Sequence, residues 1–294
     1  MAKRPTRRSS SPRSRDLHPA RVLGLCPTSR LARTIVLFES ADSTNAVAAE
    51  AASRGAPEGL LVVAEEQRRG TGRRGRTWSS GRGKSLTFSL VLRPACRAEG
   101  LTAILALAAV KVLGAIKKAA ATPDAEALAI LRRRGGRGGS RLDVRIKWPN
   151  DVLIDGRKAA GILAEAKGDA VVIGMGLNVN ERPEELPAGV SPAAVSLATA
   201  VGRNLDRGRL LARLVGTFEE LYVRFEREGF AAFRSEIEDL LLYVGSTVTV
   251  DAGDVKLEGG LLGITDDGYL RLAVAGEERI VSSGDLTVRE EAHG

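Results

Sequence analysis

The 294 residues include 44% apolar side chains, enough for one large domain or two unequal ones, and they contain no apolar run of membrane-spanning length. The two histidines lie near the chain ends, and neither they nor the two cysteines have the spacing of zinc ligands, which excludes zinc sites and His-based acid–base chemistry. The formal net charge of +8 is located in residues 1–33, because acidic and basic side chains balance in the rest of the chain.

Residues 1–33 are expected to form a disordered basic tail, whose deletion should leave activity intact. The segment is rich in Arg, Ser and Pro, so it has too little apolar surface to offset the entropy of ordering. It lacks the apolar stretch of a secretory signal, and Cys26 and Cys96 do not suggest a disulfide framework. These features predict a reducing compartment, and we expect a cytoplasmic location.

A globular pattern begins at Thr34. Asp-Ser-Thr-Asn at 42–45 is an N-cap cluster, and the Ala-rich stretch after it predicts a helix that stops at Gly55. The stretch 101–121 is apolar nearly all round, which is typical of a central helix. In chain order, the predicted elements of this part are strand 34–38, helix 46–53, strand 60–64, an alternating strand 85–92 and helix 101–121.

A Gly/Arg insertion at 122–141 is expected to be a flexible low-complexity loop. After Tyr243 short β-type runs alternate with Asp/Gly turns, which predicts a small barrel. The elements predicted after the insertion are strands 143–148, 152–154, 159–166 and 170–177, helices 209–228 and 230–241, and strands 246–251, 255–264, 269–274, 279–282 and 286–289. The expected fold class is α+β, with a mixed β-sheet packed with helices in residues 34–241 and a β-barrel in residues 242–291.

The first segment suited to chemistry is the stretch 67–78, which directly follows a predicted strand. It contains five Arg and three Gly and no acidic residue. Glycine lets backbone N–H groups approach an anion closely, and guanidinium groups match the oxygens of phosphate or carboxylate. We interpret the segment as a mobile anion-binding loop that orders around its ligand. The alternatives are a solvated basic loop and an RGG-like contact with nucleic acid.

A lysine at the end of an apolar strand begins the second segment, Lys147-Trp148-Pro149-Asn150-Asp151. The proline stiffens the turn, and Asn150 and Asp151 favour a turn and could orient the ammonium group. An ordinary turn with a lysine that reaches solvent is the alternative. In the return strand that follows, Gly161 would let a flat ligand lie against the backbone.

The third segment is an apolar strand that ends in Gly174-x-Gly176-x-Asn178. Such an ending can hold a small ligand by close backbone approach and by the Asn amide. Close packing is the default explanation of an isolated Gly-x-Gly pair. The segment is therefore informative only together with the other two.

Together and in this order, the segments resemble those of biotin protein ligases, over roughly residues 34–290. The distinctive matches are Lys-Trp-Pro-Asn-Asp at 147–151 and the Gly/Arg loop at 70–76 with Trp78. Supporting matches are Asp-Ser-Thr-Asn at 42–45, Lys-x-x-Gly-Ile-Leu at 158–163 and Gly-x-Gly-x-Asn-Val at 174–179. The resemblance implies the biotin–lipoate ligase fold, which is like that of class II aminoacyl-tRNA synthetases, followed by an SH3-like barrel.

The resemblance also implies the reaction. Biotin protein ligases condense biotin with ATP to biotinyl-5′-adenylate and pyrophosphate, and then pass biotin to a lysine of a biotin carboxyl carrier protein. Joining a carboxylate to an anionic α-phosphate requires cations, which Lys147, the Arg loop and Mg²⁺ would supply. Biotin is then the substrate, ATP the co-substrate and Mg²⁺ an activator, and no metal ligated by protein side chains is expected.

Residue roles follow from the matched motifs. Lys147 and Arg73 are the expected catalytic residues: Lys147 would contact the biotin carboxylate and the α-phosphate, and Arg73 would close over the adenylate together with Arg76. The expected biotin-binding residues are Ser43, Thr44, Asn45, Gln67, Thr71, Gly72, Arg73, Lys147 and Gly161. The expected nucleotide-binding residues are Arg73, Arg76, Trp78, Asn150, Lys158 and Asn178, with Trp78 and Asn178 on the adenine side.

The sequence departs from the family pattern at Thr71, where Arg or Lys is frequent, so one cation contact to the ligand is expected to be missing. No helix-turn-helix domain is expected ahead of residue 34, which predicts a monofunctional ligase with neither specific DNA binding nor membrane contact. Whether the chain forms a homodimer is left open. The alternatives are a lipoate or octanoate ligase or transferase, which shares the catalytic fold, and a nucleic-acid-binding protein that uses the tail and the Arg clusters.

Overall fold

The computed structural model describes residues 16–28, 30–96, 98–116, 141–190, 192–253 and 255–288. The predicted insertion at 122–141 lies outside the described residues except for Arg141, and so do the first fifteen residues of the predicted tail. None of the described helices is both long and apolar enough to cross a membrane.

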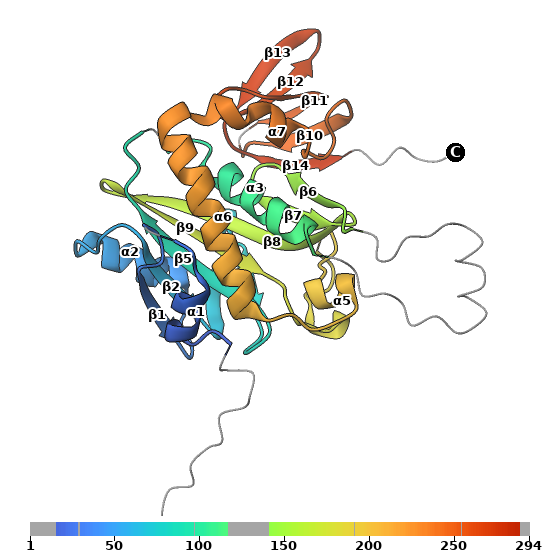
Figure 1. Cartoon of the computed structure of the whole chain (residues 1–294). Helices are drawn as coiled ribbons and strands as arrows, with labels where there is room; N and C mark the ends of the chain where they lie inside the picture. The colour runs from blue at the N-terminus through green and yellow to red at the C-terminus, as the bar shows by residue number, and fades with distance from the viewer. Residues whose placement is uncertain are drawn as a thin grey trace, which may run out of the picture.

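A seven-stranded mixed sheet lies at the centre of the molecule, with the strand order β1-β2-β5-β9-β8-β7-β6. Its strands are β1 (Thr34–Phe38), β2 (Leu60–Ala64), β5 (Leu86–Leu92), β6 (Val144–Lys147), β7 (Asp151–Ile154), β8 (Arg157–Lys167) and β9 (Ala170–Leu177) (Figure 1). β1 and β2 are parallel, and the other neighbours are antiparallel. The mixed sheet confirms the predicted α+β class. β5 is buried along its whole length instead of alternating, because both faces of the sheet are covered.

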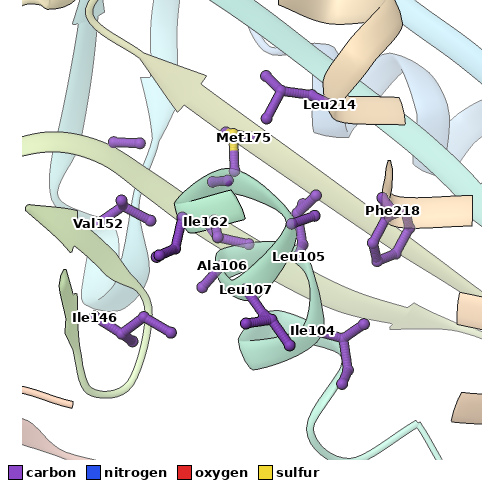
Figure 2. Close-up of a cluster of buried hydrophobic side chains, with 14 of the residues drawn as sticks. Ile104, Leu105, Ala106, Leu107, Ile146, Val152, Ile162, Met175, Leu214 and Phe218 are labelled. Carbon is purple, nitrogen blue, oxygen red and sulfur yellow. The ribbon is translucent and has the colours of Figure 1, made fainter. Parts of the chain in front are cut away.

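Helices cover both faces of this sheet (Figure 1). α3 (Leu101–Gly114) and α6 (Arg207–Glu228) pack together on one face, and α2 (Thr44–Ser53) packs on the other. Figure 2 shows the core on the first face, where Leu105 of α3 and Phe218 of α6 lie near the strand residues Ile162 and Met175. α3 is buried nearly all round, as predicted for a central helix.

Alternation along β9 sends its side chains to the two faces. Met175 belongs to the core under α3 and α6, whereas Val172 packs with α2. By the same period of two, Gly174 and Gly176 lie on the α2 face. That face carries the candidate site.

The helices differ from the prediction mainly at their ends. The Ser43 hydroxyl accepts a hydrogen bond from Ala46 N at 3.4 Å, so α2 starts at Thr44 and not at residue 46. α3 ends at Gly114, and the predicted part beyond residue 116 lies outside the described residues. The predicted helix 230–241 is a 3₁₀ turn followed by the short α7 (Arg234–Glu238), and α5 (Leu197–Val201) was not predicted.

The N-terminal segment 16–33 is packed, so the prediction of a disordered tail is wrong for its described residues. It contains α1 (Pro19–Leu25), which contacts α6 and β1. Leu17, Val22 and Leu31 are fully buried in the main core. A few apolar side chains suffice here, because they enter a core that the rest of the chain has already built.

Ion pairs fix the same segment to α6. Asp16 accepts hydrogen bonds from Nε and Nη2 of Arg207, at 3.1 and 2.7 Å. Arg21 Nη1 donates to Asp206 Oδ1 at 3.0 Å, and Asp206 is the N-cap of α6. Part of the basic charge expected on a free tail therefore neutralises carboxylates of the body. A further set of ion pairs joins Arg30 to Glu58 and Glu226.

Residues 243–288 form the C-terminal module, a separate five-stranded antiparallel sheet with the order β13-β12-β11-β10-β14. This agrees with the five strands of the predicted SH3-like module. Its strands are β10 (Thr247–Asp251), β11 (Lys256–Ile264), β12 (Leu270–Val274), β13 (Glu277–Val281) and β14 (Asp285–Val288). Trp148 Nε1 donates to Gly268 O of the module at 3.2 Å. Phe230 packs against Gly268 and against Gly100, at the start of α3, so it joins the module to the larger part.

Candidate active site

A cavity of about 450 Å³ lies on the α2 face of the large sheet. Its walls come from the start of α2, from β8 and β9, from the turn between β6 and β7, and from a hairpin of β3 (Gln67–Thr71) and β4 (Thr77–Ser80). The C-terminal module contributes residues 285–287. Within the described ranges, no three His, Cys, Asp or Glu side chains gather as a metal-binding group.

Polar side chains at the start of α2 form one end of the cavity. The backbone N and Oγ1 of Thr44 both donate to Gln67 Oε1, at 2.7 and 3.0 Å. Ser89 Oγ lies 2.8 Å from Thr44 Oγ1 and 2.7 Å from Asn45 Oδ1. Asn45 Nδ2 donates to Glu165 Oε2 at 2.8 Å. These bonds hold the polar groups of this end in fixed directions.

The two glycines of β9 make room for side chains of the protein. A Cβ at Gly174 would lie 2.0 Å from Asn45 Oδ1, and a Cβ at Gly176 would lie 2.3 Å from the Trp78 ring. Trp78 also lies over Gly161, where a Cβ would be 3.4 Å from its Cζ3. The flat group predicted to lie on Gly161 is therefore an indole ring of the chain itself in this structure.

Two lysines reach the cavity in different electrostatic situations. Lys158 Nζ lies 2.7 Å from Asp151 Oδ1 and 5.9 Å from the centre of the Trp78 ring. Lys147 is half-buried, and among the described residues its ammonium has no hydrogen-bond or ion-pair partner. Burial lowers the pKa of Lys147, while the nearby Asp151 raises it and Lys158 lowers it. Lys147 therefore has its charge available to an anion in the cavity.

The Arg-rich segment, predicted as a mobile loop, is a folded hairpin in the structure; we call residues 67–80 the Arg hairpin. β3 and β4 pair antiparallel, and a 3₁₀ turn at Arg73–Gly75 joins them. Gly72 N donates to Arg76 O at 2.6 Å and closes this turn. Arg73 and Arg76 line the cavity, and burial lowers the pKa of Arg73. The hairpin thus places two guanidinium groups on the side of the cavity that also holds Lys147.

Two predicted asparagines brace the strands that carry the site. Asn150 Nδ2 donates to Ile162 O at 2.9 Å, which ties the turn after β6 to β8. Asn178 is buried, and its Nδ2 donates to Val195 O at 3.3 Å. Both residues also line the cavity, so they can contact a ligand with their remaining polar atoms.

All of the site residues expected from the sequence lie around this one cavity. They are Ser43, Thr44, Asn45, Gln67, Thr71, Gly72, Arg73, Arg76, Trp78, Lys147, Asn150, Lys158, Gly161 and Asn178. Sequence reasoning missed Ser89 and Glu165, which support the start of α2, although a serine inside the apolar run of β5 is a signal for the first. It also missed Asp285, which lies far from the Arg hairpin along the chain and has no local signal.

Two family models match the chain. The model described as the biotin/lipoate A/B protein ligase family matches residues 37–180. The model described as the biotin protein ligase C terminal domain matches residues 243–289. The second match favours the biotin branch over the lipoate branch of the first model.

Individual proteins are similar over most of their length. The bifunctional ligase/repressor BirA of Bacillus subtilis is 32% identical over 264 residues, which is 88% of this chain and 75% of that protein. The biotin–[acetyl-CoA-carboxylase] ligase of Mycobacterium tuberculosis is 34% identical over 257 residues, which is 86% of this chain and 88% of that protein. Among solved structures, the biotin protein ligase from Aquifex aeolicus in complex with biotin and ATP has a TM-score of 0.68 at 27% identity. That match covers 88% of this chain and 100% of the other.

Proposed function

Because this chain belongs to the biotin protein ligase family, we infer that it is the enzyme that attaches biotin to protein in an ATP-dependent reaction. The observation that carries this conclusion is that one cavity is lined both by the bonded polar groups at the start of α2 and by four cationic side chains. These cations are Arg73, Arg76, Lys147 and Lys158.

We propose the start of α2 as the site of the biotin head group. The ureido ring presents donors and acceptors in one plane, so it needs partners whose directions are fixed. The bonded cluster of Thr44, Asn45 and Gln67 offers such partners. The proposed biotin-binding set is Ser43, Thr44, Asn45, Gln67, Thr71, Gly72, Arg73, Lys147 and Gly161, all around the cavity.

The four cationic side chains are proposed to hold ATP. In the first step a carboxylate oxygen of biotin attacks the α-phosphorus and pyrophosphate leaves, which brings two anions together. Lys147 and Arg73 would stabilise the charge on the carboxylate and the phosphate, and their partial burial strengthens this effect. The proposed nucleotide-binding set is Arg73, Arg76, Trp78, Asn150, Lys158 and Asn178.

Magnesium is part of the proposal as the ion that accompanies ATP. Mg²⁺ takes oxygen ligands, keeps several waters and is commonly held by phosphates with one or two carboxylates. The proposal keeps the phosphates of ATP and waters as the ligands of the ion and assigns no protein side chain to it. When bound, Mg²⁺ offsets negative charge on the phosphates.

The biotin carboxyl carrier domain of a carboxylase is the proposed acceptor, by similarity to relatives that are named biotin–[acetyl-CoA-carboxylase] ligases. Its lysine amine would attack the carbonyl carbon of the adenylate and release AMP. A cytoplasmic location is proposed from the two free cysteines. We further propose that residues 34–241, together with the packed segment 16–33, form the ligase domain and that the C-terminal module is a second domain.

The test is exchange of labelled pyrophosphate into ATP. The wild-type chain should catalyse exchange with biotin and not with lipoate or octanoate. Lys147→Ala should lower the exchange rate by about 100-fold or more, the size typical for loss of one group that stabilises transition-state charge. Lys111→Ala is the control, because Lys111 lies on α3 outside the cavity and pairs with Glu236. Wild-type exchange that does not depend on biotin would contradict the proposed function.

A further inference from the structure

The tip of the Arg hairpin rests on the C-terminal module through all three of its arginines. Arg73 Nη1 donates to Gly284 O at 3.1 Å. Arg74 Nη2 donates to Asp251 O at 2.8 Å, and its Nη1 lies 3.5 Å from carboxylate oxygens of Asp251 and Asp285. Arg76 Nη2 donates to Asp285 Oδ1 at 2.5 Å. The module therefore offers two carboxylates to the tip.

Only one of these carboxylates belongs to the cavity. Asp285 lines the cavity together with Arg76, whereas Asp251 contacts Arg74 outside the cavity wall. The side chains of Arg76 and Asp285 are 58% and 31% exposed. A pair with this exposure contributes little to stability, so another anion can replace one member at low cost.

We propose that Asp285 is a positioning residue of the nucleotide site. In the absence of ATP it holds Arg76 at the cavity wall, and when ATP binds, a phosphate replaces Asp285 as the partner of the Arg76 guanidinium. The inference rests on the proposed ligase function. A phosphate offers more negative charge and more acceptor oxygens than a carboxylate, so it displaces Asp285 from Arg76 when ATP enters the cavity. When AMP leaves and no phosphate remains in the cavity, Arg76 pairs with Asp285 again.

Buried contacts fix the base of the Arg hairpin, so the change of the Arg76 partner affects only the tip. Arg207 is fully buried; its Nη1 lies 2.8 Å from Glu65 Oε2 and donates to Ser85 O at 3.2 Å. Glu65 precedes β3 and Ser85 follows β4, so one buried guanidinium holds both ends of the hairpin. Buried pairs of this kind are costly to break. The tip can therefore change partners while the hairpin stays attached.

The proposal predicts that removal of the Asp285 charge makes ATP bind more tightly. Asp285→Asn ends the competition for Arg76 and also removes a negative charge that repels polyphosphate. The KM for ATP in biotin-dependent exchange should fall by about three- to tenfold, as expected for one partly exposed charge. Calorimetric titration of the full chain with α,β-methylene ATP and biotin should show the same gain. The gain should shrink in 1 M salt, which screens the charge.

Three further variants separate this role from a structural one. Asp251→Asn loosens the tip without changing the charge of the cavity, so trypsin should cleave the Arg hairpin faster while the KM for ATP stays within about twofold. Glu278→Gln removes a charge of the same sign from the module at its Arg271 pair, outside the cavity wall, and should change neither property. Asp285→Glu should restore the wild-type KM.

An unchanged or higher KM for ATP in Asp285→Asn would overturn the proposal. A loss of affinity that appears only with Mg²⁺ would also overturn it, because Asp285 would then act as a ligand of the ion. If the proposed ligase function itself is wrong, the result is different, because the wild-type chain would then show no biotin-dependent exchange at all.

Discussion

Lys147 and Lys158 show how two like side chains in one cavity acquire different properties. Lys158 is neutralised by Asp151 at 2.7 Å. Lys147 is partly desolvated, and burial is the main reason why its pKa lies below the ordinary value for lysine. A partly desolvated ammonium group attracts anions more strongly than one in water, but its lowered pKa makes it lose its proton earlier than other lysines as the pH rises.

A pH dependence follows from the direction of this shift. Adenylate formation needs the ammonium form of Lys147, so kcat/KM for biotin should fall as the pH rises, with a midpoint below the ordinary lysine value of about 10.4. In Lys147→Arg the guanidinium keeps its charge at these pH values, so the fall should move to higher pH even though the rate is lower. The measurement is the exchange rate between pH 7 and 10.5.

Lys111→Arg is the matched control, because this lysine is exposed and pairs with Glu236 away from the cavity. Its pH profile should coincide with that of the wild-type chain. A profile of Lys147→Arg that falls at the same pH as the wild-type profile would assign the titration to another group.

At the scale of elements, the N-terminal segment 16–33 is a structural part of the core that surrounds the seven-stranded sheet. Complete burial of a Leu or Val side chain stabilises a fold by about 1.5–3 kcal/mol, so loss of Leu17, Val22 and Leu31 should cost roughly 5–9 kcal/mol. This is comparable with the whole free energy of unfolding of a domain. A chain that lacks residues 1–33 should therefore be unfolded or inactive, contrary to what its composition predicts.

A chain that starts at Asp16 is the control, because it keeps every contact described for the segment. Its thermal unfolding midpoint and its exchange activity should equal those of the full chain. Equal midpoints for the two truncated chains would show that α1 does not stabilise the domain.

The elements predicted well are those whose own residues determine them. The strands of the large sheet are apolar runs bounded by turn residues, and Ser43 caps α2 through its own side chain. α1 was missed because its seven residues lie in a segment of Arg, Ser and Pro, and its stability comes from α6, which is distant in sequence. The sequence of the Arg hairpin predicts a loop because its strands contain no apolar alternation.

The same contrast between local signals and distant contacts holds for the candidate site. The residues that face the cavity come from short motifs, and all of those expected lie around it. Their partners come from other parts of the chain: Ser89 and Glu165 hold Asn45, and Asp285 holds Arg76. A pairing between distant residues leaves no periodic pattern in the sequence, so only the folded chain reveals it.

At the scale of the whole molecule, the Phe230 side chain is one of the contacts that join the C-terminal module to the larger part. Phe230 is buried, and a Cβ on Gly100 would lie 2.2 Å from its Cδ2. A Cβ on Gly268 of the C-terminal module would lie 3.1 Å from the same ring. Both glycines have a positive φ, so each position is restricted by its backbone as well as by the ring.

Gly100→Ala should therefore combine two costs. The positive φ costs about 1–2 kcal/mol for an alanine, and overlap with a buried ring adds about 1–3 kcal/mol. Gly55→Ala is the matched control, because its φ of 83° is close to the 86° of Gly100 and a Cβ there would meet nothing within 4 Å. Urea unfolding followed by circular dichroism should show a clearly larger loss for Gly100→Ala. Equal losses would mean that Phe230 does not pack closely against Gly100.

The tryptophans lead to a practical consequence. The sequence contains only Trp78 and Trp148, and both line the cavity. Trp78 lies between β9 and Lys158, and Trp148 donates its indole N–H to the C-terminal module. Ultraviolet emission excited at the indole band therefore originates entirely from the walls of the ligand cavity. The intrinsic tryptophan fluorescence of the unlabelled chain can therefore be used to follow ligand binding and movement of the C-terminal module without an attached dye.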